Sequence, residues 1–227
     1  MEDIKFKQEV DNWLNEVCEQ CHKYAKDIDV DFYVFQSELP KNYNPQLLII
    51  GINPGGHKTY KKMLEEKGIE RRTKETLYYD VNTFAKKPNW ETGKGSDRMR
   101  SVLRKIFAER LFSVLENSIV MNMFWFNTTK AVDIESIAKA KKINEYCREA
   151  TMKFIEIVNP QNIIFFSSDY NRLKAIGINK IIQEGTNLKS GYLGNRKVYA
   201  IPHPTGSWGA YSKIKIEELG KLLNSIL

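Results

Sequence analysis

Short, largely apolar runs separated by stretches of helical periodicity limit most strongly what this chain can fold into. The runs that we interpret as strands are QLLII (46–50), SIVMNMF (118–124), NIIFF (162–166), NKIIQ (179–183) and KVYAI (197–201). Runs that are apolar on both faces are typical of a parallel sheet that is covered on both sides. The segment DFYVF (31–35) fits either a short strand or a loop.

Amphipathic helical patterns lie between these runs. Apolar residues at spacings of three and four predict helices over residues 3–26, 97–110 and 137–158, and a last helix at the C-terminus. Strands that alternate with helices indicate an α/β fold. We therefore predict one domain over residues 1–227, a three-layer α/β/α sandwich around a central, mainly parallel sheet of about four to five strands.

Length, charge and hydropathy indicate the expected compartment and kind of partner. The 227 residues suffice for one well-buried core, and the formal net charge of +7 favours polyanionic partners. The first ten residues carry acids and no apolar core of a signal peptide, and no run reaches the roughly 18 apolar residues of a membrane span. We expect a cytoplasmic monomer with no membrane partner.

The cysteines at first suggest a cofactor. Cys18 and Cys21 lie in CEQCH, which matches the haem-attachment pattern. Their spacing from Trp13 and Val17 places both thiols on the buried face of the first helix instead. With Cys147 the chain has three cysteines, one fewer than an iron–sulfur cluster normally takes. We interpret all three as core residues and expect no cofactor and no metal.

Polar segments follow three of the predicted strands. GINPGG (51–56) follows the first, Asn122 lies near the end of the second, and HPTGS (203–207) follows the last. Open α/β sheets place their sites at the carboxyl ends of the strands. The candidate site is therefore expected where these segments converge.

The first of these segments is nearly a phosphate-binding P-loop. Gly51 and Gly56 have the spacing of G-x-x-x-x-G-K-[ST], but His57 occupies the lysine position and Lys58 comes one residue late. Pro54 also removes one backbone N–H that such a cradle uses. A nucleotide-hydrolysing enzyme is the weakest of the interpretations that we consider.

The three segments together resemble motifs of the uracil-DNA glycosylase superfamily. GINPG is similar to the water-activating motif of its mismatch-specific branch and to the GMNPG form of its single-strand-selective branch. HPTGS resembles the DNA-intercalation loop, and IVMN (119–122) resembles the strand whose terminal asparagine reads the base. The resemblance implies hydrolysis of the N-glycosidic bond of uracil or a related deaminated base, in single- or double-stranded DNA.

The resemblance also implies roles for single residues. Asn53 would hold the attacking water, and His203 would donate to the uracil oxygen as negative charge develops there. Asn122 would read the base, because its amide accepts from uracil N3–H and donates to O4. The implied substrate-binding residues are Gly51, Ile52, Pro54, Gly55, Phe84 and Asn122, with backbone N–H groups near Gly55 and Gly56 assisting.

Further residues would contact DNA. Phe84 or Tyr79 would stack on the extrahelical base, and Trp208 would fill the vacated stack. Thr205, Gly206 and Ser207 belong to the same loop, and Arg98 and Arg104 lie on a basic helix face that can track phosphates.

Each assignment has a structural alternative. The glycine segment can be a plain strand-to-helix turn, Asn122 can cap a turn, His203 can simply end a strand, Trp208 can pack in the core, and the basic face can be solvated. The main alternative function is a catalytically silent nucleic-acid-binding protein of the same fold.

Overall fold

A computed structural model describes most of the chain. The described residues are 2–37, 39, 44–56, 58–67, 73–78, 98–107, 111–128, 140–204 and 211–227. They form a mixed α/β protein with a six-stranded sheet, more strands than the four to five expected. The chain divides into two compact units, each assembled from separated segments, so the division does not follow the order of the sequence.

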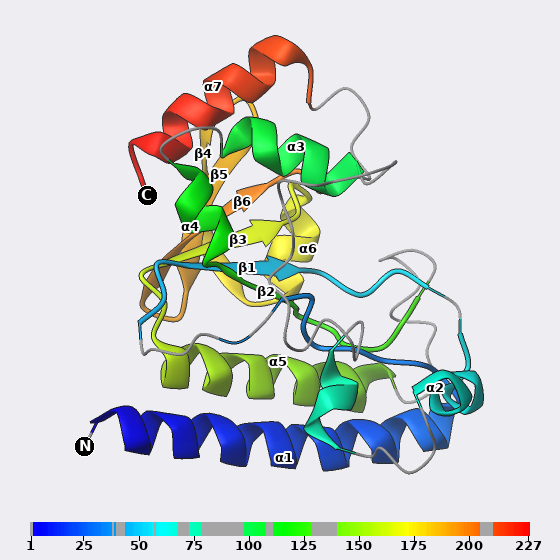
Figure 1. Cartoon of the computed structure of the whole chain (residues 1–227). Helices are drawn as coiled ribbons and strands as arrows, with labels where there is room; N and C mark the ends of the chain where they lie inside the picture. Colours follow the sequence, from blue (N-terminus) through cyan, green and yellow to red (C-terminus); the bar gives the residue numbers. More distant parts are fainter. Residues whose placement is uncertain are drawn as a thin grey trace. The chain divides into compact units, whose positions relative to one another are not determined.

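The first unit comprises Met1–Asn44, Ile52–Lys86 and Ile119–Asn159. Its elements are α1 (Glu2–Ile28), α2 (Tyr60–Lys67), the 3-10 helix η1 (Lys74–Leu77), β2 (Ile119–Asn122) and α5 (Ala140–Val158). The helices α1 and α5 pack side by side (Figure 1). Both helices match the sequence prediction to within a few residues, because their apolar stripes repeat at helical spacing.

Aromatic packing between α1 and α5 forms the core of the first unit. Trp13 is 1% exposed, and its indole N–H donates to the Ala150 carbonyl at 2.9 Å. Its ring centroid lies 4.7 Å from that of Phe154 and 6.0 Å from that of Trp125. The indole therefore buries a large apolar area and keeps its polar atom bonded.

The cysteines are core residues, as the helix pattern predicts. Cys18, Cys21 and Cys147 are free thiols, and all three are buried. Burial raises the pKa of the Cys21 thiol well above its usual value and that of Cys147 to about 12. Thiols of this kind stay protonated and unreactive near neutral pH.

The segment DFYVF is extended without forming a full strand. Phe32 bridges Phe126, and Phe35 bridges both Tyr78 and Met121. Phe32, Val34 and Phe35 are fully buried. The alternative left open by the sequence, strand or loop, thus resolves as an extended segment of isolated bridges.

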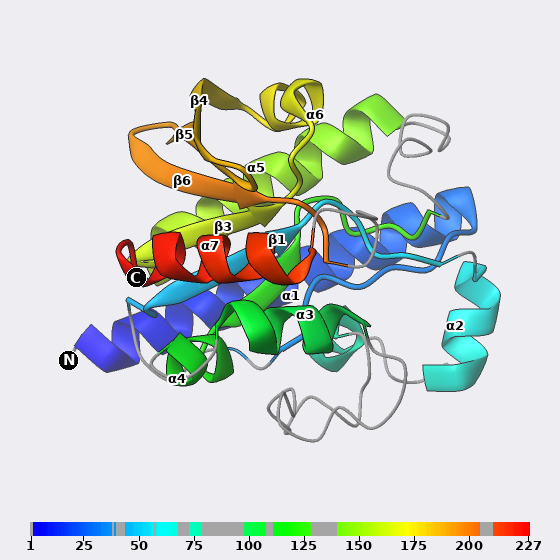
Figure 2. The same ribbon diagram turned by 90° about the horizontal axis from the view of Figure 1, so that it is seen from above.

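The second unit comprises Pro45–Gly51, Lys87–Ser118 and Pro160–Leu227. Its strands are β1 (Leu47–Gly51), β3 (Asn162–Phe166), β4 (Ile178–Gly185), β5 (Leu188–Leu193) and β6 (Arg196–Ile201). Its helices are α3 (Arg98–Ile106), α4 (Phe112–Glu116), α6 (Tyr170–Ala175) and α7 (Lys213–Asn224). The helices α3 and α7 lie against each other (Figure 2).

The strands of the second unit follow the order β1-β3-β6-β5-β4. β1 pairs with β3 and β3 with β6 in parallel, with Leu47 opposite Asn162 and Ile164 opposite Tyr199. β1 is buried at every position, which is the pattern of a strand covered on both faces.

The antiparallel part of this sheet corrects the sequence prediction. β5 was not among the predicted strands, and it pairs antiparallel with both β4 and β6. Gly194, with φ of +61°, occupies the tight turn between β5 and β6. A two-residue turn of this type joins antiparallel neighbours, so the sheet is mixed rather than mainly parallel at this edge.

Candidate active site

The GINPGG turn leaves β1 and pairs with the segment that follows β2. Within the first unit, the Ile52 carbonyl accepts from the Phe124 N–H at 2.9 Å. The Pro54 carbonyl accepts from the Thr128 N–H, and the Gly56 N–H donates to the Thr128 carbonyl, both at 3.3 Å. These bonds place the residues around Asn53 beside the residues that follow Asn122.

The amide of Asn53 is held in one orientation. Its Nδ2 donates to Thr128 Oγ1 at 2.6 Å and to the Pro54 carbonyl at 2.9 Å, and it lies 3.5 Å from the Thr128 carbonyl. Carbonyl oxygens only accept hydrogen bonds, so the group facing them must be the NH₂. The Oδ1 of Asn53 is thereby directed away from these partners and remains an acceptor for a ligand.

Asn122 lies at the end of β2 and is 1% exposed. Its N–H donates to the Val34 carbonyl at 2.9 Å, and its carbonyl accepts from the Trp125 indole at 3.0 Å. Neither Nδ2 nor Oδ1 of its side chain has a hydrogen-bond partner among the described residues. A turn-capping role would require a side-chain hydrogen bond, so this geometry argues against the structural alternative.

Leaving the amide of Asn122 unpaired is costly. A buried polar group without a partner costs about 1–3 kcal/mol relative to one that is bonded. Most buried side-chain polar atoms in proteins have a partner, and exceptions call for an explanation such as a ligand or an ordered water. In the first unit the amide of Asn53 therefore keeps an acceptor, and the fully buried amide of Asn122 has no partner among the described residues. Backbone bonds join the residues around Asn53 to those that follow Asn122.

The same turn is unsuited to a phosphate. The Gly56 N–H is committed to the Thr128 carbonyl, and Pro54 has no N–H and presents its carbonyl to Thr128. The expectation that backbone N–H groups near Gly55 and Gly56 assist the substrate stays a prediction, although the Gly56 N–H already has a partner within the protein. A cradle needs several free N–H groups that converge, so the arrangement argues against the P-loop interpretation.

The glycines of the turn differ in their surroundings. A Cβ added to Gly55, which is exposed, would meet nothing within 4 Å. A Cβ added to Gly56, with φ of +153°, would come within 2.9 Å of Asn127 Nδ2. Gly51 ends β1, and Ile52 is 4% exposed, so these two residues form the buried base of the turn.

His203 follows β6 in the second unit and is half-buried. Its ring meets the ring of Phe166 edge to face, with centroids 5.8 Å apart. Burial lowers the pKa of His203 below its ordinary value of 6.5. The imidazole is therefore neutral at pH 7, and a neutral imidazole can donate one hydrogen bond without carrying charge.

The basic helix α3 is amphipathic, as predicted. Val102, Leu103 and Ile106 are buried, whereas Arg104 and Lys105 are exposed.

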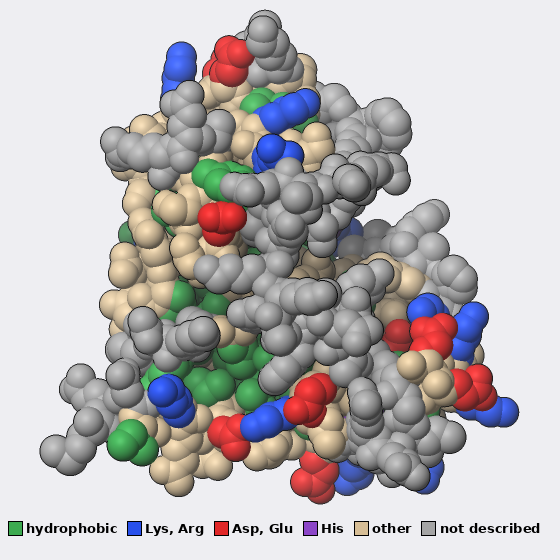
Figure 3. Space-filling view, viewed as in Figure 1, with side chains coloured by type: hydrophobic (Ala, Val, Ile, Leu, Met, Phe, Trp, Pro, Cys, Tyr) green, Lys and Arg blue, Asp and Glu red, His purple; other side chains and the backbone are tan. Residues whose placement is uncertain are grey.

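In the face of the molecule shown in Figure 3, basic and acidic side chains alternate along α1. On that helix the positive surplus of the chain does not form a single-sign patch.

Several predicted site residues lie outside the described residues. These are Phe84, Tyr79, His57, Thr205, Gly206, Ser207, Trp208 and the side chain of Arg98. Their roles remain predictions from the sequence resemblance.

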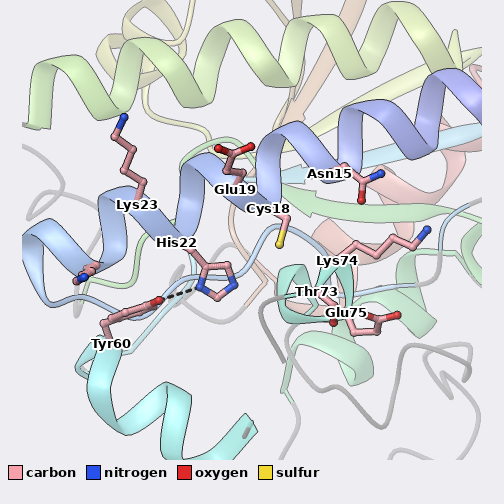
Figure 4. Close-up of a pocket in the computed structure, with 10 residues that line it drawn as sticks. Asn15, Cys18, Glu19, His22, Lys23, Tyr60, Thr73, Lys74 and Glu75 are labelled. Atoms are coloured by element: carbon pink, nitrogen blue, oxygen red, sulfur yellow. Dashed lines mark hydrogen bonds between the residues drawn. The ribbon is translucent and has the colours of Figure 1, made fainter. Parts of the chain in front are cut away.

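A separate cavity of about 620 Å³ lies between α1, α2 and η1 (Figure 4). The buried His22 lies on its wall, with Nδ1 3.0 Å from the Tyr60 hydroxyl and Nε2 2.9 Å from Thr76 Oγ1. Thr76 Oγ1 donates its hydrogen to the Thr73 carbonyl at 2.7 Å, so it accepts from Nε2. Both ring nitrogens are engaged by the protein, which makes His22 a structural link between three helices.

Sequence reasoning missed three residues that shape the candidate site. Thr128 orients Asn53, Asn127 packs against Gly56, and the carboxylate of Asp31 accepts from Asn127 Nδ2 at 3.1 Å. The segment FNTT (126–129) begins two residues after the end of the second predicted strand, SIVMNMF (118–124). Its polar residues, just beyond a strand end, were the available sequence signal for Asn127 and Thr128. Their importance depends on a long-range pairing that no local pattern encodes.

Comparison with known proteins adds no family. No protein-family model matches this chain, and no curated protein matches it in sequence. Among the described residues, no helix is long and apolar enough to cross a membrane. The same residues contain no group of three or more His, Cys, Asp or Glu side chains placed to hold a metal ion.

Proposed function

We propose that this chain is a monofunctional DNA glycosylase of the uracil type, which hydrolyses the N-glycosidic bond of uracil or a related deaminated base. The observation that carries the proposal is the fully buried amide of Asn122, which has no partner among the described residues and precedes the segment bonded to the turn that holds Asn53. Uracil would supply both missing hydrogen-bond partners of this amide, because its N3–H donates to Oδ1 and its O4 accepts from Nδ2.

The attacking water would be held by Asn53. Since Nδ2 of Asn53 is committed to Thr128 and Pro54, its Oδ1 is the atom left to accept a hydrogen from water. An amide oxygen positions water and does not remove its proton. The chemistry then depends on departure of the base with the electron pair of the glycosidic bond, leaving an oxocarbenium-like sugar for the water to attack.

His203 would stabilise the departing base. A neutral imidazole N–H that donates to the uracil oxygen becomes more favourable as negative charge grows there, which is the logic of an oxyanion hole. The lowered pKa of His203 supports this role, because it keeps the imidazole neutral under ordinary conditions. The basic residues of α3, including Arg104, would add contacts to DNA phosphates, and binding would then weaken steeply with salt.

The test uses uracil-containing single- and double-stranded oligonucleotides, followed by alkali to break the strand at abasic sites. Wild-type protein is expected to cleave at uracil, and Asn53→Ala, Asn122→Ala and His203→Ala are each expected to lower kcat about 100-fold or more. Asn15→Ala, which removes an exposed asparagine, is the matched control. A cytosine-containing oligonucleotide controls for specificity. Cytosine presents an acceptor at N3 and a donor at N4, the reverse of uracil, so it would pair with the Asn122 amide only if that amide were turned by 180°.

The outcomes separate the alternatives. DNA binding without strand breaks at high protein concentration would identify a silent nucleic-acid-binding protein. Wild-type rates in the three variants would refute the role assignments. ATP turnover that depends on Mg²⁺ would revive the P-loop interpretation.

A further inference from the structure

In the second unit, one face of the antiparallel strands β4, β5 and β6 carries large side chains that solvent reaches. Ser190 of β5 lies opposite both Ile182 of β4 and Tyr199 of β6, and Tyr192 of β5 lies opposite Lys197 of β6. Positions 190 and 192 point to the same face of the sheet, and residues that lie opposite one another share a face. Ile182 is 58% exposed and Tyr192 is 38% exposed. We call the surface formed by Ile182, Tyr192, Lys197 and Tyr199 the tyrosine face.

Each tyrosine of this face has a lysine ammonium over its ring. Lys180 Nζ lies 5.8 Å from the ring centroid of Tyr192, and Lys197 Nζ lies 5.4 Å from that of Tyr199. Tyr192 and Tyr199 are diagonal neighbours across β5 and β6, an arrangement that places side chains about 7–8 Å apart. Two aromatic rings, each accompanied by a positive charge, therefore lie next to each other.

One acidic side chain also meets this face. Glu184 Oε1 accepts from the Ser190 hydroxyl and lies 3.9 Å from Lys197 Nζ. The side chains of Lys197 and Glu184 are 50% and 36% exposed, and an ion pair in such contact with water contributes little to stability. A phosphate can therefore replace the carboxylate as the partner of Lys197. With Lys180 included, the charges of the face sum to a positive surplus.

The edge of the sheet beside the tyrosine face is built against pairing with another strand. β4 is the edge strand of the sheet (Figure 2). Its register with β5 shifts between Asn179 and Ile182, and Lys180 between them has φ of +49°. A bulge and a lysine on an edge strand both oppose the addition of a further strand. A partner is therefore expected on the face of these strands and not along their edge.

We propose that the tyrosine face binds single-stranded nucleic acid, with successive bases stacked on Tyr192 and Tyr199 and with phosphates beside Lys180 and Lys197. Every base has a π-face, so tyrosine rings bind single strands of any sequence, and lysines complement the charge of the backbone. At an exposed site, stacking of a base on a ring is a stronger contact than that of an ammonium with the ring. A base can thus take the place of the ammonium, which then pairs with the phosphate. The inference goes beyond the proposed glycosylase function, because it requires no damaged base.

The first test measures binding of a fluorescein-labelled, uracil-free single-stranded DNA of mixed sequence by fluorescence anisotropy. Tyr192→Ala should raise Kd about 5- to 150-fold, which is the effect of losing one stacked base. Tyr192→Phe keeps the ring and should bind as the wild type does. Duplex DNA of the same sequence should bind equally to Tyr192→Ala and to the wild type, because its bases are already stacked on one another.

Tyr170→Ala is the matched control. Tyr170 of α6 is 46% exposed, and Lys174 Nζ lies 4.7 Å from its ring centroid, so it too is an exposed tyrosine with a lysine over its ring. The residue before α6 on the other side is linked to the opposite face of the sheet, since Lys189, which alternates with Ser190, donates to the Ser168 carbonyl. Tyr170→Ala should therefore leave Kd at the wild-type value.

The second test uses a substitution that should strengthen binding. Glu184→Gln removes the negative charge beside Lys197 and keeps an oxygen that accepts from Ser190, so Kd should fall about 2- to 5-fold. A gain in affinity cannot arise from a folding defect, so this test holds even where Tyr192→Ala fails to fold. Lys197→Gln should lower the slope of log K against log salt concentration by about 0.7, the value for one phosphate contact with a single strand.

The outcomes are distinct. Wild-type Kd in Tyr192→Ala or in Glu184→Gln would overturn the inference, and so would an equal loss in Tyr170→Ala. A loss of duplex binding in Tyr192→Ala as large as that of single-strand binding would also overturn it. Single-strand binding that shows the expected changes, in a protein that does not cleave at uracil, would support this inference and refute the proposed function.

Discussion

Asn122→Leu should stabilise the protein while it abolishes the proposed glycosylase activity. The side chain of Asn122 is 1% exposed, and both of its polar atoms lack partners among the described residues. Each buried polar group without a partner costs about 1–3 kcal/mol. Leucine is similar in size and carries no polar atoms, so it removes this cost and adds apolar burial.

The expected gain in the free energy of unfolding is about 1–3 kcal/mol, after allowance for the different shape of leucine. For a chain of this length, that corresponds to a rise in Tm of about 2–4 °C per kcal/mol. Urea unfolding followed by circular dichroism, with a thermal scan of the same samples, measures both quantities. A gain in stability with a loss of activity is the pattern expected where an unpaired buried polar group serves a ligand.

Asn127→Leu is the control that makes this result decisive. Asn127 is also a buried asparagine of the first unit, but its Nδ2 bonds to the buried carboxylate of Asp31 at 3.1 Å. The same substitution there removes this hydrogen bond between two buried groups and should lower stability by about 1–3 kcal/mol. If Asn122→Leu destabilised the protein as much as Asn127→Leu, the amide of Asn122 would be bonded in solution and the reasoning would fail.

Two further predictions concern the turn and the histidine. Gly56→Ala should cost about 1–3 kcal/mol, because φ is +153° and the added methyl would meet Asn127 Nδ2, whereas Gly55→Ala, facing open space, should unfold at nearly the wild-type urea concentration. Equal midpoints for the two variants would contradict this account of the turn. Since the pKa of His203 in the folded protein lies below 6.5, the unfolded chain binds more protons between the two pKa values, so stability should be lost as pH falls below about 6.5. His203→Gln should remove this part of the pH dependence, and an unchanged difference between wild type and variant from pH 7.5 to 5 would show that the histidine does not titrate as described.

Elements with a strong local pattern were predictable from the sequence. The helices α1 and α5 and the strands β1, β2 and β3 are encoded by apolar residues at spacings that one element alone explains. β5 was not, because LKSGYL (188–193) mixes lysine, serine and glycine. Its Gly191 is there for close approach, since a Cβ would come within 2.6 Å of Ile178 Cγ2 and 2.9 Å of the Asn179 carbonyl. From sequence alone, a glycine of this kind favours a loop, and its place in a strand becomes clear only once the adjacent strand is known.

The residues of the candidate site likewise fall into those that local sequence could predict and those that it could not. Asn53 and Asn122 could be predicted as site residues because each lies at or just after the end of a recognisable strand. Asp31 and Thr128 could not, because their role is to orient amides that lie far away in sequence. Asn127 is 96 residues from Asp31, and Asn53 is 75 residues from Thr128. Side-chain identity is local information, whereas the direction in which an amide points is set by contacts that only the fold brings together.

This difference decides how the glycine-rich turn should be interpreted. Its glycine spacing suggests a phosphate cradle, whose chemistry comes from convergent N–H donors. In the structure Pro54 contributes a carbonyl, the Gly56 N–H is used internally, and Asn53 and Asn127 each have their NH₂ committed to protein acceptors. Among the side-chain amides described at the turn, the group that remains unpaired is therefore acceptor oxygen. An acceptor suits a water or an N–H-bearing base and repels a phosphate, which supports the proposed glycosidic hydrolysis over nucleotide binding.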